Sequence, residues 1–182
     1  LAAEKGRLMK DLAASNLVAA YSGYEKKPAL ALPLAARLNE RYPPNYNFTF
    51  ALINILSDVG RFGEAKGLVE EMEKAIRAGK PPYRPELWPR YHQAVGKIAF
   101  DRGEYDKAAE SLNLAVKDTA PYNARVRAVA LVRLGMIQDV RKNRNAAEES
   151  YRKALEVKGA EGLAQRLARE YLEAPYTPPT RK

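Results

Sequence analysis

The chain has 182 residues, of which 46% are hydrophobic, and its 31 Lys and Arg against 22 Asp and Glu give a formal net charge of +9. It contains no cysteine, which excludes disulfides, thiolate metal sites and cysteine nucleophiles. The positive charge favours acidic partners, nucleic acid among them. Charges of both signs alternate along the predicted helices, however, and this pattern favours a solvated surface. The most apolar stretch, residues 29–38, is too short to span a membrane.

The N-terminal region is alanine-rich and predicts two helices. The first covers residues 6–20, and the second begins at Pro28, a residue that suits the first turn of a helix, and reaches Arg41. The segment YPPN, residues 42–45, then interrupts the chain. We expect residues 1–45 to form a divergent helix pair. Because the first residue is leucine, we also expect the chain to be an excised fragment or a processed product.

Three related segments follow, and each predicts a helical hairpin. They read GRFGEA at 60–65, GEYDKA at 103–108 and KNRNAA at 142–147. The predicted helices cover residues 48–59 and 63–77, then 91–102 and 105–117, then 125–140 and 146–157. Proline-containing inserts at 78–89 and 118–124 separate the hairpins, because proline disfavours helix at the residue before it.

Small residues stand in these hairpins where a core usually carries leucine. Gly103 lies at a predicted turn, where a residue without Cβ can adopt a positive φ. We expect Gly96 and Ala108 to face each other, so that two helix axes approach closely. Leu112 and Tyr151 would then fill the gaps between neighbouring helices, as close packing requires.

The C-terminal region predicts one more helix and a tail. Residues 161–173 form an amphipathic pattern whose apolar stripe contains Leu163, Leu167 and Tyr171. A stack of helix pairs needs a terminal cap with a polar outer face, and this helix fits that role. The last segment, residues 174–182, is proline-rich and predicts an extended tail.

The repeated units resemble the tetratricopeptide repeat family. The matching positions are Leu52, Phe62, Ala65 and Val69 in the first unit, His92, Val95, Gly96, Ala108, Leu112, Ala115 and Pro121 in the second, and Leu131, Leu134, Gly135, Ala147, Tyr151 and Ala154 in the third. The resemblance implies an all-α fold, an α-solenoid of stacked antiparallel helix pairs. Three clear units would span residues 46–159, between the divergent N-terminal pair and a capping helix at 160–173. Residues 48–72 also resemble a pentatricopeptide repeat, a helical hairpin that reads RNA.

Residues suited to catalysis or to metal binding are few. His92 is the single histidine, at a position where packing is the expected role, and one histidine without cysteine excludes the usual zinc sites. No glycine-rich phosphate loop occurs. Carboxylates such as Glu70 and Glu148 belong to predicted solvated helix faces, where we expect them to pair with lysines a turn away. We therefore expect no catalytic residue, no metal, no cofactor and no enzyme activity.

The family resemblance also implies where a partner would bind, because the first helix of each unit lines the concave face of such a solenoid. The expected binding residues are Asn47, Phe50, Asn54, Arg90, Gln93, Lys97, Phe100, Arg133 and Met136, with Val129, Val132 and Asp139 on the same face. The amides can bond a peptide backbone, the cations can attract a carboxylate, and the apolar residues can take apolar side chains. This mixture suits an extended peptide. Trp88, near the first insert, is either a plug between two units or an anchor for a partner.

The sequence thus predicts a non-catalytic scaffold that binds an extended peptide or another protein. Two alternatives remain open, an RNA-binding helical-repeat protein and the regulatory or targeting domain of a larger enzyme. The style of the repeats, with long inserts, favours a bacterial source, with the cytoplasm or the periplasm as the compartment.

Overall fold

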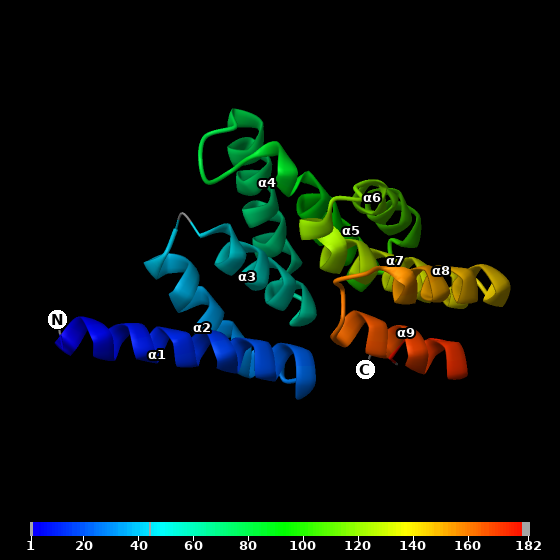
Figure 1. Cartoon of the computed structure of the whole chain (residues 1–182), viewed down its shortest axis with the longest axis horizontal. Helices are drawn as coiled ribbons and strands as arrows, with labels where there is room; N and C mark the ends of the chain where they lie inside the picture. Colours follow the sequence, from blue (N-terminus) through cyan, green and yellow to red (C-terminus); the bar gives the residue numbers. More distant parts are fainter. Residues whose placement is uncertain (1, 44, 180–182) are drawn as a thin grey trace. The chain divides into compact units, whose positions relative to one another are not determined.

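The structure, a computed structural model, describes residues 2–43 and 45–179. Within these residues the chain forms α-helices joined by short turns, without a β-strand, and this confirms the predicted all-α class. Within each of two compact units, consecutive helices pack against one another, as expected for a helical-repeat solenoid (Figure 1). The helices divide into two compact units, residues 1–84 and 85–182, and each is described by itself. The predicted division into residues 1–45, 46–159, 160–173 and 174–182 stays a prediction.

The first unit consists of four helices that pack in chain order. They are α1 (Ala2–Ala19), α2 (Pro28–Arg41), α3 (Tyr46–Asp58) and α4 (Phe62–Ala78), and a π-helical turn, η1 (Ala20–Tyr24), follows α1. Helix α1 packs on α2, α2 on α3 and α3 on α4. Pro28 occupies the first turn of α2, as predicted.

An ion pair between the buried Asp11 and the exposed Arg41 connects α1 to the end of α2. Asp11 is 5% exposed and accepts hydrogen bonds from Arg41 Nη1 at 2.7 Å and from the Tyr42 hydroxyl at 2.8 Å. The Arg41 guanidinium, by donating to this carboxylate, holds the pKa of Asp11 below its usual range. Since a buried carboxylate needs such donors, these contacts fix how α1 crosses α2.

The second unit contains two helical hairpins and a terminal helix. Its elements are η2 (Pro85–Leu87), α5 (Trp88–Arg102), α6 (Tyr105–Lys117), η3 (Pro121–Asn123), α7 (Ala124–Val140), α8 (Arg144–Glu156) and α9 (Leu163–Glu173). Helix α5 pairs with α6, and α7 pairs with α8 and also contacts both α5 and α6. Helix α9 covers the second hairpin by packing on α7 and α8 (Figure 1). The buried amide of Gln165 joins α9 to α8 by donating to the carbonyls of Leu155 and Val157 at 3.1 Å.

Several helix boundaries differ from the predicted ones, since α1 begins at Ala2 and α5 at Trp88, both earlier than predicted, and side-chain caps explain two further differences. Helix α6 covers the predicted residues. Helix α3 begins two residues earlier than predicted, because the Asn45 side chain accepts a hydrogen bond from the Asn47 backbone N–H at 3.1 Å. Helix α8 also begins two residues early, because Asn143 accepts from the Ala146 N–H at 3.4 Å.

Each hairpin turns through one residue with positive φ. Gly60 has φ 78° and Gly103 has φ 82°, so the prediction for Gly103 is confirmed. The corresponding residue of the third hairpin is Lys142, with φ 60°. A lysine is strained in this conformation, whereas glycine is not.

Close approach of paired helices depends on glycines inside them. A Cβ atom at Gly96 would lie 2.6 Å from Leu112 Cγ and 3.3 Å from the Ala108 carbonyl oxygen. Ala108 and Leu112 are both fully buried. The predicted contact between Gly96 and the second helix of its hairpin is therefore confirmed.

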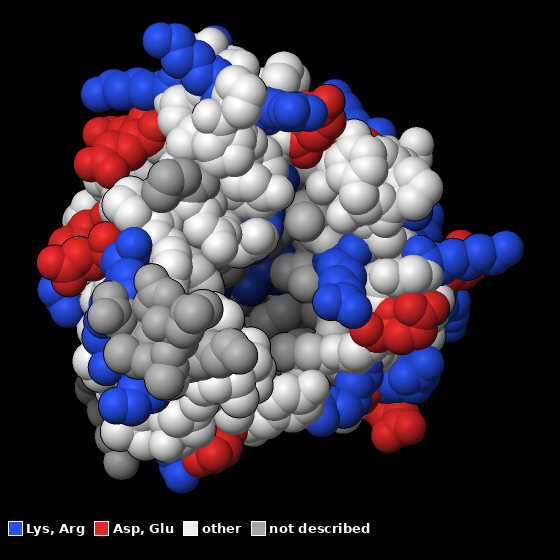
Figure 2. Space-filling model, turned by 60° about the vertical axis from the view of Figure 1, so that its left-hand side comes forward, with Lys and Arg blue, Asp and Glu red and all other residues white. Residues whose placement is uncertain are grey.

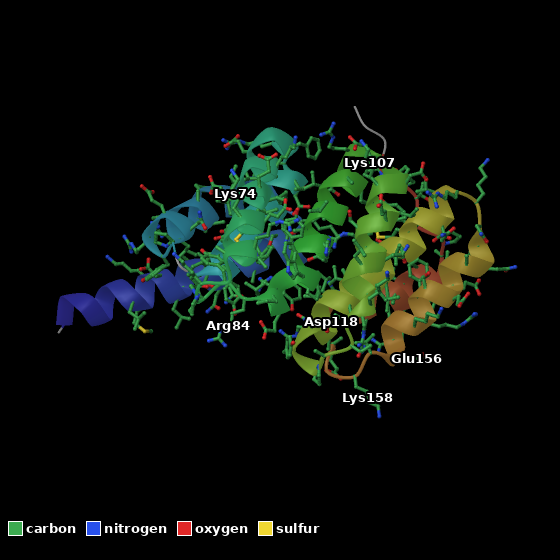
Figure 3. The ribbon with its side chains drawn as sticks, turned by 90° about the horizontal axis from the view of Figure 1, so that it is seen from above. Lys74, Arg84, Lys107, Asp118, Glu156 and Lys158 are labelled. Carbon is green, nitrogen blue, oxygen red and sulfur yellow. The ribbon has the colours of Figure 1, made fainter. Side chains whose placement is uncertain are left out.

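Charged side chains of both signs lie at the surface. Lys and Arg are interspersed with Asp and Glu on the face shown in Figure 2. Lys107 and Lys158 point away from the helices of their unit (Figure 3). Several cations pair with a carboxylate one turn away, for example Lys66 with Glu70 and Lys153 with Glu149. This arrangement is that of a solvated surface, as the alternating charges predicted.

Candidate functional site

The predicted binding residues are distributed over three helices in the two compact units. Asn47, Phe50 and Asn54 lie on α3, in the first unit. Asn47 is exposed, Asn54 is half-buried, and Phe50 is buried with 1% of its surface exposed. The remaining predicted residues lie on α5 and α7, in the second unit.

The α5 residues lie on one side of their helix, because they follow each other at intervals of three and four. Arg90 is half-buried, Gln93 and Lys97 are buried, and Lys97 donates to the carboxylate of Asp101 one turn later. Its charge is thus already neutralised within α5. Phe100, at the end of this row, is 8% exposed.

The structure brings Phe100 of α5 and Met136 of α7 into one apolar cluster. Met136 is half-buried and packs against the core residues of both hairpins, while Arg133, one turn earlier, is half-buried. The same cluster receives Tyr176, which comes from the tail beyond α9. Two predicted binding residues therefore meet at a place that the chain's own C-terminal segment covers.

Tyr176 is held by aromatic contacts from two helices. Its ring centroid lies 5.9 Å from that of Phe100 and 5.5 Å from that of Tyr171 on α9, the latter pair edge to face at 74°. Tyr105, at the start of α6, adds an edge contact to Phe100 at 5.6 Å. The chain leaves α9 in extended conformation at Ala174, with φ −137° and ψ 129°. No helix is present over the described tail residues 174–179, and the extended conformation of the whole tail stays a prediction.

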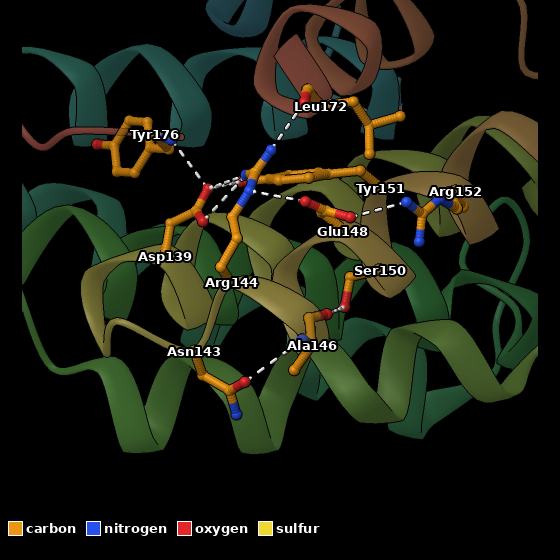
Figure 4. A network of polar contacts seen from close by, with 10 residues as sticks. All are labelled: Asp139, Asn143, Arg144, Ala146, Glu148, Ser150, Tyr151, Arg152, Leu172 and Tyr176. Carbon is orange, nitrogen blue, oxygen red and sulfur yellow. Dashed lines mark hydrogen bonds and ion pairs between the residues drawn. The ribbon is translucent and has the colours of Figure 1, made fainter. Parts of the chain in front are cut away.

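The buried carboxylate of Asp139 anchors the tail through its backbone (Figure 4). The side chain of Asp139 is 1% exposed and accepts from the Tyr176 N–H at 2.9 Å and from the Tyr151 hydroxyl at 2.8 Å. Arg144 supplies the opposite charge, with Nη1 3.2 Å from the Asp139 Oδ1. The same guanidinium donates to the Leu172 carbonyl, in the last turn of α9, at 2.8 Å. One carboxylate thus links α7, α8 and the tail.

We call this place the tail-binding face and define it by Phe100, Tyr105, Met136, Asp139 and Tyr171. Burial raises the pKa of Tyr176 to about 12, and Tyr105 and Tyr171 beside it act in the same direction. Burial likewise raises the pKa of the Tyr171 hydroxyl. The tyrosines around the tail are therefore neutral at ordinary pH, and the face binds through its rings and through one acceptor carboxylate.

Sequence reasoning placed Asp139 on the binding face without giving it a role, and it treated Tyr171 as a stripe residue of the cap. It missed Tyr176 altogether. A signal was present, since PYTPP places one aromatic residue inside a proline-rich segment that cannot form a helix. Nothing local in the sequence indicates that this segment folds back onto α7.

Trp88 lies on the first turn of α5, half-buried, with two rings against it. The centroid of Tyr91 is 5.2 Å away, edge to face, and that of His92 is 5.8 Å away in a stacked arrangement. His92 thus packs against an aromatic ring, the kind of role expected from its position. The alternative between plug and anchor for Trp88 stays a prediction.

A hollow occurs in the first unit, between α2 and α4. It measures about 510 Å³, with Leu52 and Leu56 of α3 at its floor and Leu32 and Leu68 among its walls. None of the predicted binding residues lines it. Over the described residues, no group of three His, Cys, Asp or Glu side chains is arranged to hold a metal ion. Nor is any helix in this part of the chain both long and apolar enough to cross a membrane.

The comparisons with known proteins concern the second hairpin of the second unit, formed by α7 and α8. Residues 128–161, which contain most of α7 and all of α8, match the family model described as tetratricopeptide repeat. The resemblance expected from the sequence is thereby confirmed. No curated protein and no solved structure matches the chain. Tetratricopeptide repeats in general form protein-interaction scaffolds and are typically non-catalytic.

Proposed function

Because the chain contains a tetratricopeptide repeat, we propose that it is a non-catalytic scaffold that binds an extended segment of a partner protein on the face formed by α5 and α7. One observation carries the proposal. Tyr176, in the non-helical segment that follows α9, already lies on this face with a backbone hydrogen bond to Asp139 and ring contacts to Phe100 and Tyr171.

The chemistry of the face supports an extended ligand. An extended segment offers N–H groups that no helix uses, and the buried Asp139 carboxylate accepts one of them. A charged acceptor in a desolvated place binds an N–H more strongly than a neutral acceptor does. The surrounding rings supply apolar area with few rotamers to lose, which keeps the entropic cost of binding low.

The other predicted residues extend the proposed site beyond the tail-binding face. Arg90, Gln93 and Lys97 continue the row of Phe100 along α5, and Arg133 lies one turn before Met136 on α7. We assign Arg90 and Arg133, which are half-buried, to polar contacts with a longer ligand, while the binding roles of the buried Gln93 and Lys97 stay a prediction from the sequence. The α3 residues Asn47, Phe50 and Asn54 lie in the first unit, and their part in partner binding stays a prediction from the family geometry.

Methionine methyl NMR tests the proposal, because the chain has only three methionines. Met136 contacts the proposed site, Met72 is buried in α4 and Met9 is exposed on α1. Peptides are selected for binding to the full chain from a random extended library and titrated into methyl-labelled protein. We expect a shift of the Met136 resonance while those of Met9 and Met72 stay in place.

Two matched variants distinguish direct contact with the peptide from an indirect effect on the Met136 resonance. Phe100→Leu keeps an apolar side chain but removes the ring, and we expect it to weaken the selected peptides by about tenfold, as for the loss of one aromatic anchor. Tyr122→Ala removes a ring that is 67% exposed on η3 and should leave binding unchanged. Selected peptides that move Met9 or Met72 instead of Met136 would place the site elsewhere and refute the proposal.

A further inference from the structure

We propose that the tail-binding face recognises an aromatic residue flanked by prolines in an extended partner segment, and that Tyr176 occupies this place until the partner displaces it. This inference rests on the proposed function and adds to it the kind of segment bound and the competitor that controls access. The contacts that hold the tail support it.

The ring of Tyr176 occupies a place made by two different helices. Phe100 of α5 lies on one side at 5.9 Å and Tyr171 of α9 on the other at 5.5 Å. The Tyr176 side chain also joins the apolar cluster that includes Met136. An aromatic side chain fills a space between rings with edge and tilted contacts that an aliphatic side chain cannot make.

The backbone contact adds a second requirement. The residue that fills the aromatic place must donate its own N–H to Asp139, as Tyr176 does at 2.9 Å. Proline cannot meet this requirement, because it has no backbone N–H. Prolines on either side of the aromatic residue are compatible with it, because they keep the segment extended and leave the N–H of the aromatic residue available. The tail has this order, with Pro175 before the tyrosine and Pro178 and Pro179 after it. The partner class is therefore an extended segment with a proline-flanked aromatic residue.

The covalent link makes the tail an effective competitor. Only Ala174 and Pro175 lie between the end of α9 and Tyr176. A short connection of this kind gives the tail an effective concentration in the millimolar range. A partner then binds with an apparent affinity reduced by the fraction of chains whose face is vacant. Weakening the tail should therefore strengthen the binding of a second segment.

A tail peptide added in solution tests this competition. The probe is fluorescein-labelled EAPYTPP, which copies residues 173–179, and binding to the full chain is followed by fluorescence anisotropy. The variant Tyr176→Ala vacates the aromatic place, and Tyr122→Ala is the control that removes an exposed tyrosine from η3. Thermal unfolding of both variants verifies that the helices remain intact.

We expect Tyr176→Ala to bind the probe at least about tenfold more tightly than the natural chain and Tyr122→Ala, since the internal competitor is lost. The peptide EAPATPP should not bind, and EAPYTPP should shift the Met136 methyl resonance of Tyr176→Ala. Equal probe affinity for Tyr176→Ala and the natural chain, or no binding to either, overturns the inference. If library-selected peptides still shift Met136 in that case, the proposed function survives; if none does, both fall.

Discussion

The backbone of Gly135 on α7 lies directly against the ring of Tyr151 on α8. A Cβ atom at position 135 would be 2.7 Å from Tyr151 Cδ1, and the same atom at Gly96 would be 2.6 Å from Leu112 Cγ. The two hairpins of the second unit thus use one device, in which a glycine on the first helix makes room for a large side chain on the second. Tyr151 and Leu112 are fully buried, so neither can move out of the way into solvent.

Gly135→Ala should destabilise the protein. The added methyl collides with a ring whose hydroxyl is held by Asp139, and overpacking of this kind costs about 1–3 kcal/mol. Gly67→Ala is the control, because Gly67 lies inside α4 with no atom within 4 Å of an added Cβ. That change should instead stabilise by about 0.5–1 kcal/mol, the difference in helix propensity. Chemical denaturation measures both, and a rise in stability for both variants would contradict the packing.

Ala108→Leu tests the contact between α5 and α6 at Gly96, from the side of α6. Ala108 is fully buried, and its carbonyl oxygen would lie 3.3 Å from a Cβ at Gly96. A larger side chain there must push α6 from α5, and we expect a loss of about 1–3 kcal/mol and a clearly lower melting temperature. Ala109→Leu is a suitable comparison, because Ala109 is half-buried. The melting temperature of this variant should change less than that of Ala108→Leu. An unchanged thermal transition for Ala108→Leu would be incompatible with this packing.

The sequence predicted those features that depend on local pattern. The hairpin helices and the turn at Gly103 follow from helical spacing and from the conformational freedom of glycine, and the structure has them. Helix starts at α3 and α8 were wrong by two residues, because the Asn45 and Asn143 caps were not recognised. The docking of the tail on this face was missed because it depends on contacts between residues far apart in the sequence, such as the hydrogen bond between Tyr176 and Asp139, 37 residues apart. No periodicity encodes such a contact.

Lys142→Gly should stabilise the third turn. Lys142 has φ 60°, where a side chain costs about 1–2 kcal/mol, while glycine adds about 0.5–1 kcal/mol of unfolded-state entropy. The net gain is about 0.5–1 kcal/mol. Gly103→Ala makes the reverse change at φ 82° and should lose about 1 kcal/mol. The denaturation midpoint of each variant is compared with that of the natural chain. If both midpoints shift in the same direction, the two turns do not share this conformation.

Asp139→Ala should be among the most damaging polar substitutions in the second unit. It leaves the buried Tyr151 hydroxyl and the Tyr176 N–H without their acceptor. We expect a cost of about 3 kcal/mol, the low end for a broken buried pair, because Arg144 is 29% exposed and can be hydrated. Asp106→Ala is the matched control, since Asp106 pairs with Arg141 at the surface and is 99% exposed. Equal unfolding free energies for the two variants would contradict the anchoring role of Asp139.

Alkaline pH should release the tail. Burial raises the pKa of Tyr176 to about 12, against about 10 for a tyrosine in an open chain. The docked tail therefore holds the phenolic proton more tightly than the released tail does. Docking keeps its full stability below a pH of about 10 and loses it as the pH rises toward about 12.

Carbon-13 NMR of labelled tyrosines, with Tyr176 assigned by its absence in Tyr176→Phe, measures this ionisation. The Tyr176 resonance should titrate near pH 12, and the Met136 methyl should shift over the same range because the tail leaves its cluster. In Tyr176→Phe the ring cannot ionise, so the Met136 resonance should show no transition there. Burial also raises the pKa of Tyr151 well above its ordinary value, so this hydroxyl holds its proton more tightly than an open-chain tyrosine does. A Tyr176 resonance that titrates near pH 10, like an open-chain tyrosine, would mean that the tail is not docked in solution.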